Sequence, residues 1–166
     1  MSMKKNFLAA MAATFLIACN SHGDKTNDNK DTAGHDMQMP AATVSMPPMP
    51  EVPVNAKVYF KNLKDGQTVT SPFTVEMGAE GLSVDTANGI VKPASGHHHI
   101  LIDRDSVATE SVILKDSVHL HFGNAQTSAD VKLSPGKHTL TLQFADALHR
   151  SYGSRLTSKV TLTVKK

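Results

Sequence analysis

Apolar and polar residues alternate with a period of two from about residue 54 to the C-terminus. Every second residue is apolar in segments 73–77 and 118–122, and the same pattern runs through 140–144. Successive side chains of a strand point to opposite sides, so this pattern predicts β-strands with one buried face. Turn residues such as Ser134-Pro135-Gly136 separate the runs. No segment has the apolar period of an amphipathic helix, so the pattern favours an all-β domain.

These runs predict about seven short strands, and an immunoglobulin-like antiparallel β-sandwich is the simplest fold that buries their apolar faces. The runs lie at 58–60, 73–77, 97–103, 118–122, 129–133, 137–144 and 160–164. A closed barrel is the alternative fold. The predicted domain, residues 54–166, is long enough to enclose one hydrophobic core.

The first 18 residues have the pattern of an export signal. Lys4 and Lys5 precede an apolar run over 7–18, which is too short to cross about 30 Å of hydrocarbon as a helix. The run ends Leu-Ile-Ala-Cys at 16–19, which resembles the lipobox of bacterial lipoproteins. In that family the signal is cleaved before the cysteine, and the thiol then carries a diacylglycerol. We therefore expect residues 1–18 to be removed and Cys19 to anchor the protein to a membrane.

Residues 19–53 are predicted to be a lipidated cysteine followed by a disordered tether rich in Met and Pro. The segment has almost no large aliphatic residues, so it cannot bury enough apolar surface to offset its ordering entropy. Its proline-rich end, residues 46–53, should be stiffer. Asn20 is not the aspartate that retains many enterobacterial lipoproteins at the inner membrane. We therefore favour the outer membrane of a bacterial cell envelope.

Composition excludes several classes of function. The chain has 17 basic and 15 acidic residues, and two of the basic ones, Lys4 and Lys5, leave with the signal, so the mature chain is formally neutral. We expect no nucleic-acid binding, because no excess of basic residues is available for phosphates. The single cysteine excludes an internal disulfide and a Cys-rich zinc or iron–sulfur site. We expect a monomer that contacts the membrane through its lipid.

Histidines are unusually frequent, with nine in the chain and seven in the predicted domain. Three are consecutive, and neighbouring strand residues face opposite sides, so the triplet cannot act as one set of three ligands. If Ile100 faces the core, His98 faces the core with it, and His97 and His99 lie on the outward face. A second pair, His119 and His121, is outward-facing by the same parity.

Four outward imidazoles gather on one patch if these two strands are neighbours. Neutral imidazole is a good ligand for copper and zinc, and a set without cysteine is unlike structural zinc sites. The pattern therefore predicts a metal site formed by His97, His99, His119 and His121. The alternatives are an anion site or a hydrogen-bonded structural network.

Further candidates are secondary. In the domain they are His98, His149, Asp103 and Asp146. His149 follows the strand predicted over 137–144 and can reach a site beside Asp146. In the tether, His35, Met37 and Met39 form a His-x-Met-x-Met motif, whose thioethers favour Cu(I).

Three motifs carry a family resemblance. They are Gly-His-His-His-Ile-Leu-Ile-Asp at 96–103, His-Leu-His-Phe-Gly at 119–123 with Gln126-Thr127, and Pro-Gly-Lys-His-Thr-Leu at 135–140 with Ala145-Asp146 and His149. Through these motifs the domain resembles a family of secreted bacterial proteins catalogued as a domain of unknown function, DUF4399. The resemblance implies an export signal and a β-rich domain, but no established activity. His149 is followed by Arg150-Ser151-Tyr152, where we would expect a proline in the family.

Together these patterns predict an envelope lipoprotein that binds copper or zinc as a buffer or carrier. The alternative is an envelope module that binds a protein or glycan and in which the histidines are structural. We expect no enzymatic activity, because no nucleophile elbow, phosphate loop or HExxH signature is present. A hydrolytic site built from Asp103, Asp146 and a histidine is the least favoured hypothesis.

Overall fold

The computed structural model describes residues 45–166. The predicted signal peptide and the candidates Cys19, His35, Met37 and Met39 lie outside these residues. The described elements are β1 (Lys57–Phe60), β2 (Gln67–Thr70), β3 (Phe73–Glu80), β4 (Ser83–Val84), β5 (Ser95–Ile102), β6 (His119–Phe122), β7 (Ser128–Val131), β8 (Gly136–Ala145), the 3-10 helix η1 (Gly153–Leu156) and β9 (Thr157–Lys165). Within this part of the chain, no helix is long and apolar enough to cross a membrane.

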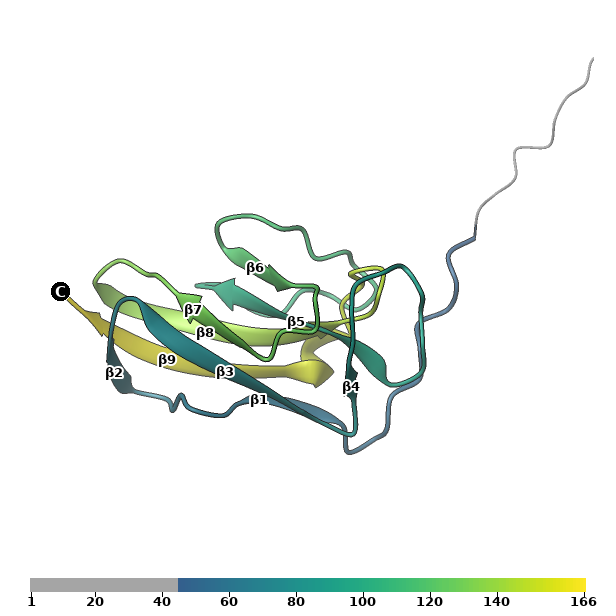
Figure 1. The fold of residues 1–166 in the computed structure, drawn as a ribbon, viewed down its shortest axis with the longest axis horizontal. Coiled ribbons are helices and arrows are strands. Elements are labelled where there is room, and N and C mark those ends of the chain that lie inside the picture. The colour runs from purple at the N-terminus through teal and green to yellow at the C-terminus, as the bar shows by residue number, and fades with distance from the viewer. Residues whose placement is uncertain (1–44) are drawn as a thin grey trace, which may run out of the picture. The chain divides into compact units, whose positions relative to one another are not determined.

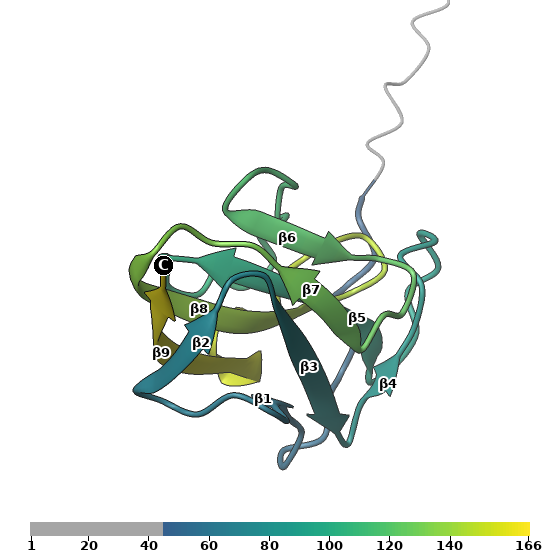
Figure 2. The same cartoon turned by 60° about the vertical axis from the view of Figure 1, so that its left-hand side comes forward.

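The strands form two sheets, so the all-β sandwich predicted from the sequence is confirmed (Figure 1). One sheet has the strand order β1-β3-β7. The other has the order β2-β9-β8-β5-β4, and β6 also pairs with β5. Figure 2 shows β3 and β7 side by side in one layer, with β8 and β5 in the layer behind.

The main core lies between the sheets and is built from alternate residues of their strands. Leu140, Leu142 and Phe144 of β8 are fully buried, as are Val75 and Met77 of β3. These residues share the parity that the sequence predicted for the inner face. Burial of such side chains contributes about 25 cal/mol per Å² of apolar surface, which makes this core the main source of stability.

Two strands differ from the prediction. Both β2 and β4 were missed, and both pair in parallel, β2 with β9 and β4 with β5. β2 holds one aliphatic residue, Val69, and β4 is only two residues long, so neither carries a readable alternation. β2 follows β1 in the chain but joins the other sheet at its edge, and this change of sheet allows the parallel pairing.

The outer face of β5 and β8 is covered by polypeptide. Residues 103–118, which connect β5 to β6, fold back over it, and residues 110–113 hydrogen-bond with 149–151. Gln143, on this face of β8, is fully buried; its side chain accepts a hydrogen bond from the Val107 N–H and donates one to the Gly153 carbonyl. A second small apolar cluster fills the space, formed by Leu101, Ile113, Ala145 and Val107.

Residues 46–53, the end of the predicted tether, lie against the domain, and we call them the strap. Met49 and Val52 pack against the main core. Arg155 donates hydrogen bonds to the carbonyls of Val52 and Pro53. Apolar contacts and arginine donors thus hold a segment whose composition alone predicted disorder.

Candidate metal centre

Four histidine side chains meet on the covered face of β5. His97 and His99 share one face of this strand, and the β5–β6 ladder places His121 directly opposite His99. His149 comes from the connection between β8 and β9. Strand pairing therefore sets the positions of three imidazoles, and a loop supplies the fourth.

The ring nitrogens of the four residues converge. The Nε2 atoms of His97 and His99 lie 2.9 Å apart, and those of His121 and His149 lie 3.0 Å apart. Across all pairs of the four rings, the centroids are separated by 4.8 to 6.1 Å. One ligand atom from each of His97, His99 and His121 lies within 4.8 Å of the other two. The group can therefore hold one metal ion.

The site is closed on one side and accessible on the other. His97 and His99 are fully buried, although the sequence parity led us to expect an outward, solvent-facing patch. That expectation is wrong because the segments 103–118 and 145–151 cover this face. His121 and His149 are half-buried, so an ion would enter from their side.

Burial favours the neutral form of His97, His99 and His121. The pKa of His97 is lowered to about 3 and that of His99 to about 2, mainly by burial and to a smaller extent by the neighbouring imidazoles. Burial also lowers the pKa of His121, with smaller effects of His149 and Lys115. Since only neutral imidazole binds a metal ion, these side chains are ready to act as ligands at neutral pH.

An unusual backbone conformation presents His149. Its φ is 66°, in the left-handed region that residues other than glycine rarely adopt. The His149 N–H donates to the carbonyl of Asp146, and its carbonyl accepts from the N–H of Ile113. The Asp146 carboxylate accepts from the N–H groups of Leu148 and Arg150, and it pairs with the Arg150 guanidinium at 2.6 Å. Asp146, a secondary metal candidate, therefore shapes this loop instead of joining the ligands.

A glycine makes room for His121. A Cβ atom added at Gly123 would lie 2.3 Å from Cε1 and 2.4 Å from Nε2 of the His121 ring. Such contacts are far shorter than van der Waals distance, so a side chain at this position would displace the imidazole.

A family comparison agrees with the sequence resemblance. The model of a domain of unknown function, DUF4399, matches residues 75–165, more than half of the chain. The chain belongs to the DUF4399 family. The matched region contains all four clustered histidines and ends with β9, while β1, β2 and the strap lie outside it. No curated protein matches the chain.

His98 of this DUF4399 domain lies on the other side of β5, in the main core. It is fully buried, and its ring centroid is 5.1 Å from that of Phe144. Its pKa is lowered to about 4, mainly by burial and to a smaller extent by Lys61. Neither ring nitrogen has a hydrogen-bond partner among residues 45–166. The predicted core orientation is correct, and His98 does not point toward the other imidazoles.

The Nδ1 atoms of His97 and His99 also have no hydrogen-bond partner in the described part of the chain. Leaving a buried polar group unsatisfied costs about 1–3 kcal/mol, so structural histidines normally use their ring nitrogens. A hydrogen-bonded network and a metal site bound through Nε2 both leave these two Nδ1 atoms without a partner among the described residues.

His119, one of the four predicted ligands, lies two residues before His121 and opposite Leu101. Its Nδ1 donates to the carboxylate of Asp116 at 2.9 Å. The fourth imidazole near His121 is that of His149, which the sequence placed among the secondary candidates. Strand parity puts His119 on the correct face, but only the tertiary fold shows how near the loop histidine comes.

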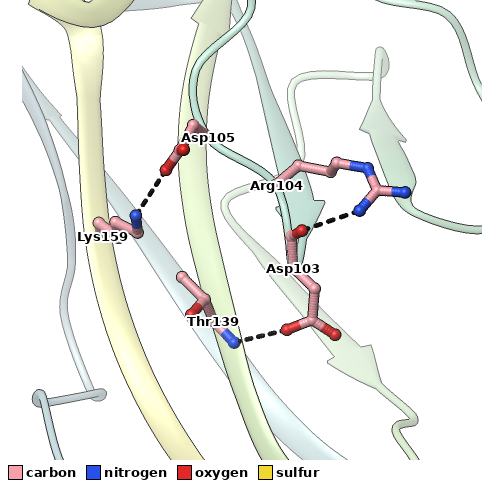
Figure 3. A pocket seen from close by; sticks show the side chains of 5 residues that line it. All are labelled: Asp103, Arg104, Asp105, Thr139 and Lys159. Atoms are coloured by element: carbon pink, nitrogen blue, oxygen red, sulfur yellow. Dashed lines mark hydrogen bonds and ion pairs between the residues drawn. The ribbon is translucent and has the colours of Figure 1, made fainter.

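Asp103, another secondary candidate, lies in a separate surface pocket (Figure 3). The pocket is lined by Asp103, Arg104, Asp105, Thr139 and Lys159. The Asp103 carboxylate accepts hydrogen bonds from the Thr139 N–H and from Nδ1 of His138, each at 2.8 Å. These partners hold the carboxylate in the pocket, apart from the four imidazoles.

The contacts of Asp103, His138 and Ser134 follow the order of a hydrolytic triad. Nε2 of His138 lies 3.4 Å from the Ser134 Oγ, but only 3.0 Å from the Ser134 carbonyl oxygen. A nitrogen that donates to a carbonyl is not free to take a proton from the hydroxyl. The three residues therefore tie the turn before β8 to the end of β5.

Arg150 and Gly123 shape the site but were not among the site residues predicted from the sequence. Gly123 directly follows the His-Leu-His-Phe strand, and that position is a usable signal for a close approach. Arg150 has no comparable signal, because its partners in the strap, Pro47 and Pro48, are distant in the chain.

Proposed function

We propose that this DUF4399 domain binds one copper or zinc ion through His97, His99, His121 and His149. The observation that carries the proposal is the convergence of four imidazoles, with Nε2 separations of 2.9 and 3.0 Å within the two pairs. Lowered pKa values keep the buried members neutral, and half-buried His121 and His149 give access from solvent.

Copper(II) fits the nitrogen separations better than zinc. Two ligands at right angles on an ion with bonds of about 2.0 Å lie about 2.8 Å apart, whereas tetrahedral ligands all lie about 3.3 Å apart. The two close pairs match the right-angled arrangement that Cu(II) prefers. The site also has no thiolate, the ligand typical of structural zinc sites.

On this proposal the protein is a lipid-anchored buffer or carrier of the bacterial cell envelope and not an enzyme. Cys19 holds it to a membrane, with the outer membrane favoured, and the domain acts as a monomer. A half-open site suits this role, because a carrier has to exchange its ion with other ligands.

One observation favours a second candidate, an interaction module with structural histidines. Both Nε2–Nε2 contacts have the length of a hydrogen bond, so each imidazole pair can join two segments without metal. In that case the cluster ties β5, β6 and the loop that carries His149 together, and the partner is a protein or glycan of the envelope.

A competition titration of the full chain in detergent, with Cu(II) and Zn(II) against a chelator of known affinity, tests the proposal. We expect Cu(II) to bind with a Kd below about 10 μM, which corresponds to a binding free energy of about −7 kcal/mol. His97→Ala and His121→Ala should each abolish this binding. His119 lies on the same strand as His121 but outside the cluster. His119→Ala is therefore the matched control and should leave copper binding unchanged.

An electron paramagnetic resonance spectrum of the Cu(II) form should show a tetragonal site with nitrogen ligands. Wild-type protein that binds neither ion, but unfolds more readily after His97→Ala, would overturn the proposal and support the structural role. Preferential binding of Zn(II) in a tetrahedral site would keep the metal site and overturn the assignment to copper.

A further inference from the structure

The strap lies beside the loop that supplies the fourth imidazole. Figure 1 shows the strap, in blue, at the same end of the domain as the connection between β8 and β9. The contact is direct, because Arg150 donates hydrogen bonds to the carbonyls of Pro47 and Pro48. Arg150 immediately follows His149 in the chain, so one residue joins the strap to the proposed ligand.

Arg150 is fully engaged in this position. It is 5% exposed, and its side chain bonds both to the strap and to the carboxylate of Asp146. The same carboxylate accepts the backbone N–H of Arg150. The guanidinium therefore fixes the distance between the strap and the loop, and a planar group with several donors is suited to such bridging.

The backbone of His149 depends on these contacts. A left-handed residue that is not glycine persists only where its surroundings hold it there. At His149 the hydrogen bonds from Ile113 and to Asp146 provide that restraint on the loop side. The strap closes the other side through Arg150, and its own position is held by Arg155 and by the N–H of Ala94, which donates to Glu51.

We propose that the strap is a positioning element for the fourth ligand, and that Arg150 is the positioning residue through which it acts. With the strap docked, His149 completes a closed set of four imidazoles. With the strap released, the loop relaxes, His149 leaves, and a three-histidine site with an open position remains. This inference rests on the proposed metal binding and specifies how the ion is retained or given up.

An open coordination position distinguishes exchangeable metal sites from closed structural ones. Release of the strap therefore prepares the ion for transfer to an incoming ligand. The strap is the end of the tether predicted over residues 20–53, so a partner that engages the preceding part of the tether acts on the ion as well. Linkage also requires the converse. Bound metal must favour docking of the strap by the same factor by which docking of the strap raises the metal affinity.

The test measures the rate at which excess chelator removes Cu(II) from the full chain in detergent. Arg155→Gln loosens the strap without touching the loop, and Arg150→Lys keeps a charge beside Asp146 but cannot span to the strap. We expect both to release copper about 10- to 100-fold faster, the usual effect of losing support for a metal ligand. Lys159→Gln, which removes an exposed ion pair with Asp105, is the matched control and should release copper at the wild-type rate.

A double-mutant cycle separates positioning from general loosening of the fold. If the strap acts through His149, Arg155→Gln adds no further acceleration to His149→Ala, and both spectra change from four to three nitrogen ligands. Limited proteolysis within residues 46–53 should slow when copper is bound.

The two proposals fail in different ways. Wild-type protein that binds neither copper nor zinc overturns the proposed function and this inference with it. Wild-type protein that binds copper, but releases it equally fast with and without the strap substitutions, overturns the strap inference alone. Acceleration by Arg155→Gln that is undiminished in the His149→Ala background also overturns it.

Discussion

The Nε2 atoms of His121 and His149 lie 3.0 Å apart, although one residue belongs to an edge strand and the other to a loop 28 positions later. Each of these imidazoles also lies next to the buried pair His97 and His99. The loop thus completes a cluster that the paired strands alone leave at three members. Four predictions test the cluster and the contacts that support it.

Gly123→Ala should weaken copper binding by about 10- to 100-fold, because the new Cβ would occupy the space of the His121 ring. The backbone of Gly123 is outside the left-handed region, so the effect on the free energy of unfolding should be small. The Cu(II) titration and a urea unfolding curve measure the two quantities separately.

Gly66→Ala is the matched control for that substitution. Gly66 has a φ of 77° and open space around it, so alanine there should lower the free energy of unfolding by about 1 kcal/mol and leave copper binding unchanged. Equal copper affinity of Gly123→Ala and wild type would show that His121 is not a ligand.

Metal-free protein should lose stability as the pH falls below about 6.5. Burial holds the folded-state pKa of His97, His98 and His99 at about 3, 4 and 2, whereas the unfolded chain has the ordinary value of 6.5. The unfolded state therefore binds more protons between these values. One fully shifted group changes the free energy of unfolding by RT ln 10 per pH unit, so the three histidines together cost about 4 kcal/mol per pH unit between pH 6 and pH 5.

Urea unfolding at a series of pH values, with a chelator present, measures this loss. His98→Leu removes one of the three groups without touching the proposed ligands, so it should reduce the slope by about a third. A free energy of unfolding that stays constant from pH 7 to pH 5 would mean that these histidines are protonated, or accessible to protons, in the folded protein.

Copper should raise the thermal stability of the folded state. At a free concentration about 100-fold above Kd, binding to the folded state alone adds about 3 kcal/mol. His121→Ala should abolish this gain and His119→Ala should retain it, as a thermal unfolding scan would show. A gain of the same size in both variants would place the ion elsewhere.

Asp146→Asn should strongly destabilise the domain. The side chains of Asp146 and Arg150 are 1% and 6% exposed, so the substitution leaves a buried guanidinium without its counter-charge. Loss of one partner of such a pair costs about 3–5 kcal/mol. Asp105→Asn, which breaks the exposed pair with Lys159, should leave the urea midpoint unchanged. Similar midpoints for the two variants would contradict the role assigned to Asp146.

The period-two pattern was sufficient to predict the sandwich and the inner face of its main strands. Leu140, Leu142 and Phe144 are buried as their parity required. The same pattern could not reveal β2, because a strand with Val69 as its only aliphatic residue has no alternation to detect. Its parallel pairing with β9 depends on a contact between segments far apart in the chain.

For the candidate site, local periodicity determined the face of each strand histidine and nothing beyond it. Parity separated His98 from His97 and His99, since that relation depends only on the geometry of one strand. Solvent exposure, the choice of His149 over His119, and the support from Arg150 were decided by the tertiary structure. They arise where residues 103–118, the loop 145–151 and the strap pack over one sheet. Contacts between segments that are distant in the chain produce no periodic pattern in the sequence.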